Sequence, residues 1–338
     1  MYNKVVGKNI LIFGDLHISD VYKGRHKDYL VNCFSVLSQI DEMIQEVNPC
    51  AIFFLGDLIG QNETNIKNRE VLTWVCKYFT KWNKTAVVYS VRGNHDMKGY
   101  PDFQFLLELD LIKTSTNGVS YVDYFGTAEQ TAPEIRFHLV DYGREDEPLN
   151  LHTNGSTTNI VLGHNDFQIS GVTTWYKSKG GLELGRHSNF NGVDYVISGH
   201  IHNPSPEIYS VLMPDSEECN LFYPGCPTRP VKEQNLYDSV WVPFFVYDVE
   251  SSSTNMDMRS FVLADKSELF YEDDTFIEEY TEDELQNQIR LKELENVLND
   301  LLKYRMTGGD PIEQIKTLPN ASDAAKEVAI SYLTKALS

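Results

Sequence analysis

Five short apolar segments of this chain each lead into a glycine followed directly by an aspartate, asparagine or histidine. In chain order the junctions are Gly14-Asp15, Gly56-Asp57, Gly93-Asn94, Gly163-His164 and Gly199-His200. The segments before them are rich in β-branched and aromatic residues, which predicts buried strands. Because sites in open α/β sheets form at the carboxyl ends of strands, we expect the five junctions to meet in one cleft.

Two of these junctions carry a second residue of ligand type two positions further along. His17 follows Asp15, and His202 follows His200, so in an extended segment both members of each pair point the same way. The glycines allow the chain to turn sharply out of a strand and to approach another backbone closely. The spacing therefore predicts a cluster of side chains rather than five separate turns.

Metal coordination is the chemistry that these side chains suit. A single Gly-Asp or Gly-His junction is usually a plain turn, but here five occur in order and use five of the nine histidines. Carboxylate, amide and imidazole ligands together favour manganese, iron or zinc over calcium. The candidate ligands are Asp15, His17, Asp57, Asn94, His164, His200 and His202. Seven ligands exceed the need of one tetrahedral ion and predict two ions, the arrangement used for phosphate-ester hydrolysis.

The rest of the main domain shows alternating strand and helix patterns. Apolar residues recur near helical spacing over Tyr29–Val47, and less regularly over Arg69–Trp82, so we expect helices there. Short apolar runs lie before, between and after these stretches, up to about residue 262. This alternation predicts an α/β layered sheet.

The character of the chain changes after about residue 262. Residues 265–284 are strongly acidic, and Thr281 and Glu284 form a capping box ahead of a helical run. A last helix is expected from Ser322. We therefore expect a main α/β domain with the candidate ligands over residues 1–262, and an acidic linker with an α-helical tail over residues 263–338. The tail could pack on the main domain, or it could dock a partner protein.

Composition and charge exclude several classes of protein. The net charge is −20, which argues against a protein that coats nucleic acid through its own lysines and arginines. It does not argue against a nucleic-acid enzyme whose metals or partner supply positive charge. The sequence has no signal-peptide pattern and no run of 18 apolar residues, so we expect no membrane partner. Five cysteines without a CxxC pair predict reduced thiols in a cytoplasmic protein.

The motifs GDLH, GD, RGNHD, GH and GHIH, in that order, resemble the signature of calcineurin-like metallophosphoesterases. The resemblance covers about residues 9–230 and implies a two-sheet α/β sandwich flanked by helices, with a dimetal site at one edge. It implies one group of ligands for each metal, namely Asp15, His17 and His202, and then Asn94, His164 and His200. Asp57 would bridge the two metals. His95 would be the catalytic acid–base group, oriented by Asp96.

A narrower resemblance is to the nuclease subunit of SbcCD-type DNA repair complexes, including their phage versions. The segment that contains Arg25 is similar to an Arg-x-x-Asp segment of those nucleases, and Tyr223–Arg229 is similar to their Tyr-Pro-Gly-Ser-x-x-Arg loop. The loop could equally be an ordinary turn before an edge strand. The resemblance implies DNA as the substrate and an SbcC-like ATPase partner docked through the tail. The resemblance is also compatible with a homodimer. If the chain comes from a phage, we expect it to act in the cytoplasm of the host.

We therefore expect a metal-dependent DNA exonuclease or endonuclease of DNA repair and recombination that uses two Mn²⁺ ions, with Fe²⁺, Zn²⁺ or Mg²⁺ as alternative metals. The candidate phosphate contacts are Arg92, Arg25 and Arg229. Arg92 stands where protein phosphatases carry a phosphate-gripping arginine, although it could also be a surface charge. The alternative function is a stand-alone phosphodiesterase or protein phosphatase. A non-catalytic scaffold is a third reading, which an intact ligand set argues against.

Overall fold

In the computed structural model, strand β2 (Asn9–Phe13) divides its side chains between two hydrophobic cores. Ile10 and Ile12 lie in the core between the two sheets, whereas Leu11 and Phe13 lie in the core beneath the helices. A strand buried on both faces needs a continuous apolar run, and this strand has one. The same division holds in β3 (Ala51–Phe54), so both central strands are covered on each face.

The first sheet has five strands in the order β14-β13-β2-β3-β4. Its parallel part is β2, β3 and β4 (Val87–Ser90), and their carboxyl ends therefore lie at one edge. β13 (Ser239–Asp248) runs antiparallel to β2 and forms a hairpin with β14 (Ser253–Val262).

The second sheet has seven strands in the order β1-β5-β6-β7-β10-β12-β11. Its strands are β1 (Asn3–Val6), β5 (Val119–Phe125), β6 (Ile135–Val140), β7 (Thr158–Gly163), β10 (Tyr195–Ser198), β11 (Tyr209–Leu212) and β12 (Glu218–Phe222). β6, β7, β10 and β12 are parallel, whereas β5 and β11 run antiparallel to their neighbours β6 and β12. The carboxyl ends of β7 and β10 therefore lie together.

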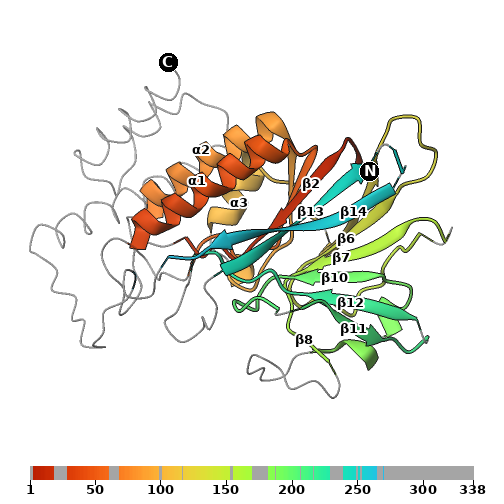
Figure 1. Ribbon diagram of the computed structural model, residues 1–338. Helices are drawn as coiled ribbons and strands as arrows, with labels where there is room; N and C mark the ends of the chain where they lie inside the picture. The colour runs from red at the N-terminus through yellow and green to blue at the C-terminus, as the bar shows by residue number, and fades with distance from the viewer. Residues whose placement is uncertain are drawn as a thin grey trace, which may run out of the picture. The chain divides into compact units, whose positions relative to one another are not determined.

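Two long helices cover the outer face of the five-stranded sheet. α1 (Tyr29–Val47) and α2 (Asn68–Thr85) lie side by side across it, and the shorter α3 (Pro101–Glu108) lies beside them (Figure 1). Trp82, fully buried, contacts Phe13 and Phe79 by edge and tilted ring contacts. The result is three layers: helices, the five-stranded sheet and the seven-stranded sheet.

The remaining elements are short and lie around the seven-stranded sheet or the site. They are the strand pair β8 (Phe167–Gln168) and β9 (Leu182–Glu183), and the 3₁₀ turns Asp96–Lys98, Leu184–Arg186 and Ser188–Phe190. Leu184 and Phe190 help to form a third core, on the outer face of that sheet. The predicted two-sheet α/β sandwich is confirmed.

The structure describes residues 3–18, 29–60, 68–98, 101–115, 117–152, 155–169, 182–186, 188–205, 207–215, 217–228, 239–248, 250–251, 253–264 and 269. The chain divides into two compact units, and the unit formed by Met1–Asn62 and Glu70–Asp274 contains every strand named above. The predicted tail helices lie outside the described residues, so the domain boundary stays a prediction. None of the described helices is long and apolar enough to cross a membrane.

Candidate metal centre

The five glycine junctions of the sequence all lie at the carboxyl ends of parallel strands. Three follow β2, β3 and β4 of the five-stranded sheet, and two follow β7 and β10 of the seven-stranded sheet. The junctions were expected to meet in one cleft. They meet between the two sheets, because the sandwich places both sets of strand ends at the same edge.

The turns that carry the candidate ligands have an unusual backbone. Six non-glycine residues of the described chain have positive φ angles, and four of them are Asp15 (52°), His17 (41°), Asp57 (53°) and His200 (77°). Such left-handed conformations are uncommon for residues with a Cβ atom, and they cluster at functional sites where surrounding contacts hold them. The backbone strain is therefore concentrated on the residues that the sequence marked as ligands.

The glycines beside these residues are needed for space. A Cβ atom on Gly93 would lie 2.1 Å from Asp57 Oδ1, and one on Gly199 would lie 2.5 Å from Asp15 Oδ2. Neither glycine has a positive φ angle, so their role is close approach rather than the turn itself. The sharp turns that the sequence assigned to the glycines are made largely by the ligand residues.

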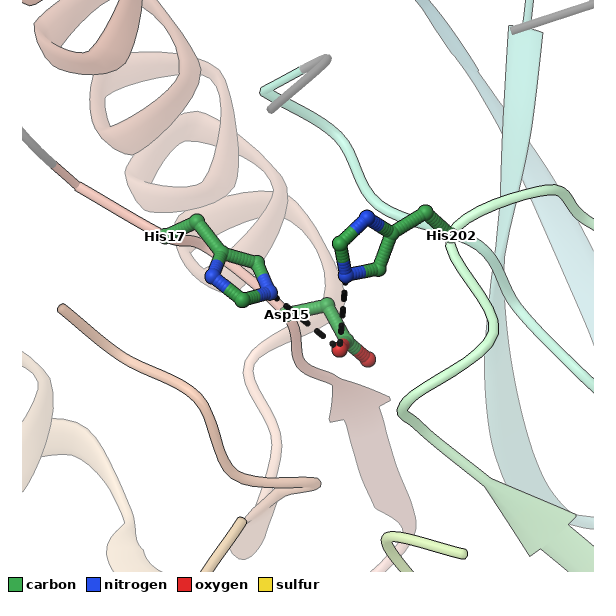
Figure 2. Close-up of side chains that lie close together, drawn as sticks. All are labelled: Asp15, His17 and His202. Atoms are coloured by element: carbon green, nitrogen blue, oxygen red, sulfur yellow. Dashed lines mark ion pairs between the residues drawn. The ribbon is translucent and has the colours of Figure 1, made fainter. Parts of the chain in front are cut away.

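Asp15 lies at the centre of the first cluster of candidate ligands. Figure 2 shows the rings of His17 and His202 pointing at the same oxygen of Asp15. The Nε2 atoms of His17 and His202 lie 3.7 Å and 4.0 Å from Asp15 Oδ1. The carboxylate also accepts the backbone N–H of His200, at 3.0 Å, which ties the end of β10 to the end of β2.

Asp57 lies at the centre of the second cluster and is also close to the first. Its Oδ2 atom lies 3.1 Å from His164 Nε2, 3.6 Å from His17 Nε2 and 3.8 Å from His95 Nε2. Its Oδ1 atom accepts the backbone N–H of His95 at 2.9 Å. His17 Nε2 is about equally far from Asp15 and Asp57, so the two clusters adjoin. The bridging role of Asp57 stays a prediction.

Asn94 joins two histidines of the other sheet. Its side-chain Oδ1 lies 3.2 Å from His164 Nε2 and 3.1 Å from His200 Nδ1. The other ring nitrogen of His164, Nδ1, lies 2.6 Å from the carbonyl oxygen of Leu55 and can only donate to it. This hydrogen bond directs the ring so that Nε2 faces Asp57 and Asn94. Metal-binding histidines are commonly oriented by a hydrogen bond from the other ring nitrogen.

The electrostatics of the cluster favour a cation. Burial disfavours the charged form of His164, but the carboxylates of Asp57 and Asp15 outweigh it and raise the pKa of His164 to about 10. Burial also raises the pKa of Asp15, more than the nearby histidines lower it. Burial likewise opposes ionisation of Asp57, yet His164, His17 and His95 hold the pKa of Asp57 well below its usual range. The ionised forms of two buried carboxylates therefore need positive charge close by.

Asp96 links two of the ligand-bearing loops. One of its oxygens accepts the backbone N–H groups of Asp57 and Gly93, both at 2.8 Å. Burial, and then the charge of Asp57, raise the pKa of Asp96 to about 7. The structure therefore places Asp96 as a support for the Asp57 and Asn94 turns. The predicted role of orienting His95 stays a prediction.

Arg92 is the only predicted phosphate contact among the described residues. Its guanidinium Nη1 lies 2.9 Å from the buried carboxylate of Asp141, and its backbone N–H donates to the same carboxylate at 2.8 Å. Its side chain remains 26% exposed. Arg25 and Arg229 lie outside the described residues, so their assignment as phosphate contacts stays a prediction.

The donor set fits divalent cations. Three groups of ligand atoms each lie within 4.8 Å of one another, namely Asp15, His17 and His202, then His17, Asp57 and His95, and then Asp15, Asp57 and His164. Donors bound to one ion at about 2.0–2.2 Å are themselves about 3–4 Å apart, which is the spacing found here. Buried carboxylates with imidazole and amide donors match manganese, iron or zinc chemistry.

Two residues near the site were not identified from the sequence. Cys226 donates its S–H to the carbonyl oxygen of Asp15 at 2.7 Å, and its N–H to that of His202 at 2.9 Å. Tyr142 lies with its ring centroid 5.6 Å from that of His200. The loop around Cys226 had a sequence signal, the Tyr-Pro-Gly pattern, whereas Tyr142 had none because it is brought to the site only by the order of the strands.

Several solved structures are similar to this chain. One is a Staphylococcus aureus protein assigned as a 5′-nucleotidase, with 14% identity and a TM-score of 0.42 over 85% of this chain and 58% of that one. A second is a dimetal phosphatase from Danio rerio, with 11% identity and a TM-score of 0.41 over 76% of this chain and 99% of that one. A third is the Pseudomonas putida nuclease MPE, with 13% identity and a TM-score of 0.30 over 75% of this chain and 87% of that one. None of the curated proteins compared with this chain matches it.

The match that decides the family is to a family model. The model for calcineurin-like phosphoesterases matches residues 8–204, which is more than half of the 338-residue chain. The matched region contains all five glycine junctions and both ligand clusters. The chain belongs to the calcineurin-like phosphoesterase family.

Proposed function

We propose that this chain is a metal-dependent nuclease that hydrolyses phosphodiester bonds of DNA together with an SbcC-like ATPase. The coarser part of this statement, a dimetal phosphoesterase, follows from the family and the Asp/His centre. Members of the family use two divalent metal ions. When bound, such ions activate water and neutralise charge on the phosphoryl oxygens.

The observation that carries the nuclease proposal is the way the Tyr223–Arg229 loop is built into the site. Cys226 hydrogen-bonds to the carbonyl oxygens of Asp15 and His202, as described above. Thr228 Oγ1 donates to the carbonyl oxygen of Leu16 at 2.6 Å. A plain turn before an edge strand would not need to bond the backbone that joins the candidate ligands Asp15 and His17. This supports the resemblance between the loop and the Tyr-Pro-Gly loop of SbcCD-type nucleases.

Within the site, His95 has the position of a proton donor. Its side chain is only partly buried (18% exposed), and its Nε2 lies 3.8 Å from the shared carboxylate of Asp57. The ring of His17 lies edge-on to it, with the centroids 5.0 Å apart. A histidine at the open side of the cluster can donate a proton to the departing oxygen while the buried residues hold the cations. We assign this role to His95.

Arg92 weakens the alternative of a protein phosphatase. A phosphate-gripping arginine presents its guanidinium fork to the substrate. Here Asp141 binds one nitrogen of that fork, and the carboxylate of Asp141 also accepts the hydroxyl of Ser115 at 3.0 Å. Arg92 is thus engaged within the protein, and the alternative gains no support from it.

The test is an assay of three substrates with the manganese-loaded protein: linear DNA, bis(p-nitrophenyl) phosphate and a phosphopeptide. We expect cleavage of DNA and of the aryl diester, with DNA cleavage stimulated by the SbcC-like ATPase and ATP. The His95→Asn variant is the control for a contaminating nuclease. Hydrolysis of the diester or phosphopeptide without any cleavage of DNA, with or without the ATPase, would return the chain to the stand-alone phosphodiesterase or phosphatase class.

The tail is the proposed dock for the ATPase. Removing residues after Asp274 leaves every candidate ligand in place, so we expect the truncated chain to hydrolyse the aryl diester at the rate of the full chain. We expect it to lose capture of the ATPase in a pull-down. Capture at undiminished strength would show that the tail is not the docking element.

A further inference from the structure

Tyr142 is an exposed aromatic side chain beside two candidate metal ligands. Its ring centroid lies 5.6 Å from that of His200 and 6.4 Å from that of His164. The side chain is 38% exposed, whereas Tyr124 and Tyr223 are fully buried in the cores. A ring in this place presents a flat apolar surface next to the position where a phosphate would bind.

The turn that carries Tyr142 is held on two sides. The backbone N–H of Tyr142 donates to the carbonyl oxygen of Arg92 at 2.9 Å, two residues before Asn94. The N–H of Gly143 donates to the side-chain oxygen of Asn165 at 3.3 Å, one residue after His164. The turn that carries the ring is therefore held by the loops of both Asn94 and His164. A preorganised ring loses less conformational entropy on binding than a mobile one.

The charge of the chain makes such a contact valuable for a nucleic-acid substrate. The net charge is −20, so few cations are available to hold phosphates away from the metals. Stacking of a base on an aromatic ring needs no cation and accepts any base, because every base has a π-face. Stacking requires that one face of the base be free of its neighbouring base, as in single-stranded DNA or at a frayed end.

We propose that Tyr142 stacks on an unpaired nucleobase next to the phosphate at the metal centre. This rests on the proposed function and deepens it, because it names single-stranded or frayed DNA as the form of the substrate that enters the site. The ring supplies affinity for the base, while the cations and their ligands supply the chemistry at phosphorus. The contact accounts for an aromatic side chain kept exposed on a rigid turn.

The experiment measures binding by calorimetry to the manganese-loaded, full-length protein. The two probes are thymidine 5′-monophosphate and 2-deoxyribose 5-phosphate, which share the sugar phosphate and differ in the base. For the wild type we expect the nucleotide to bind at least about five-fold more tightly, the lower end of what one stacked base contributes. We expect Tyr142→Phe to keep this ratio and Tyr142→Ala to reduce it to about one.

Two controls separate stacking from support of the metal centre. The metal content of each variant is measured, because Tyr142 also contacts the rings of His164 and His200. Trp74→Ala removes a comparably exposed aromatic ring (43% exposed) that packs on Phe34 between the two long helices. We expect this variant to keep the wild-type ratio.

Two results would overturn the proposal: equal binding of the two probes by the wild type, or an unchanged ratio in Tyr142→Ala. An unchanged ratio with both probes weakened would make Tyr142 a support for the ligands only. The measurement does not depend on DNA cleavage. A base-dependent ratio without cleavage of DNA would therefore contradict the nuclease proposal and leave the stacking contact in place.

Discussion

The turns that leave the five-stranded sheet carry all three oxygen-donor candidate ligands, whereas those that leave the seven-stranded sheet carry histidines. The oxygen donors are Asp15, Asp57 and Asn94, and the histidines of the other sheet are His164, His200 and His202. Hydrogen bonds cross between the sets, from the N–H of His200 to Asp15 and from His164 Nδ1 to the carbonyl oxygen of Leu55. Neither sheet holds a complete centre, so the centre forms only when the two sheets pack. Metal binding is therefore linked to folding of the sandwich.

The largest expected effect comes from the shared carboxylate of the five-stranded sheet. Asp57→Ala should reduce hydrolysis by at least about 10³-fold, because the cations contribute several kcal/mol to phosphate chemistry. It should also lower the content of both metals, whereas His202→Ala, on the other sheet, should chiefly lower one. Elemental analysis of each purified variant measures this, with the exposed Asp257→Ala as control. Two tightly bound ions in Asp57→Ala would contradict the expected difference between Asp57 and His202.

A second variant separates chemistry from metal binding. His95→Asn should lower the rate by about 10²–10⁴-fold, the usual contribution of general acid–base catalysis, and should still bind two metals. Rates and metal contents are measured on the same preparations. An activity close to that of the wild type would assign the proton donor to another group.

A third prediction contrasts two histidines of the seven-stranded sheet. Near the carboxylates the pKa of His164 is raised to about 10, but burial lowers the pKa of His138 to about 4. Below pH 6.5 the unfolded chain therefore binds a proton at His138 that the folded chain does not bind until about pH 4. Stability from this residue is constant above pH 6.5 and falls by roughly 3 kcal/mol as the pH drops to 4.

Urea unfolding of the wild type and of His138→Gln at pH 7.5, 6.0 and 4.5 measures this difference. The experiment is done in the presence of a chelator, so that metal binding does not contribute to the pH dependence. The wild type should lose more stability than the variant on acidification. Parallel curves for the two proteins would show that His138 is protonated in the folded chain over this range.

The smallest expected effect concerns the loop that reaches from one sheet to the other. Cys226 donates to the carbonyl oxygen of Asp15, so Cys226→Ala should weaken metal binding by about 10-fold. This is within the range known for residues that orient a metal ligand by a hydrogen bond. Cys226→Ser keeps a donor and should recover most of the affinity. Metal affinity is measured by chelator competition. Equal affinities for the alanine and serine variants would show that the hydrogen bond does not position Asp15.

Much of the fold could be predicted from local patterns. Tyr29–Val47 was predicted as a helix with the bounds that the structure shows, and the apolar segments before the five glycine junctions were predicted as strands and form β2, β3, β4, β7 and β10. The strands β1 and β11 were missed because edge strands have mixed patterns, and their pairing depends on distant segments. The short helix α3 was missed because its apolar residues show no clear helical spacing.

The ligands could be predicted because each follows a strand directly, so that sequence and position in the fold are tightly linked. The contacts that support them could not be predicted in this way. Asp141 and Tyr142 reach the site only because β6 lies next to β7 in the seven-stranded sheet. Close approach at the glycines was predicted, whereas the atoms that require it at Gly93 and Gly199, the carboxylate oxygens of Asp57 and Asp15, are visible only in three dimensions.

The left-handed backbone at Asp15, Asp57 and His200 has a consequence for attempts to stabilise this protein. Each such residue costs of the order of 1–3 kcal/mol relative to a relaxed turn. Glycine adopts the same φ angles without this cost. Selection or design for thermal stability alone would therefore favour glycine at these three positions and would remove ligands at the same time. Thermostable variants obtained without a functional screen should accumulate inactive centres, so stability and hydrolysis oppose each other at these turns.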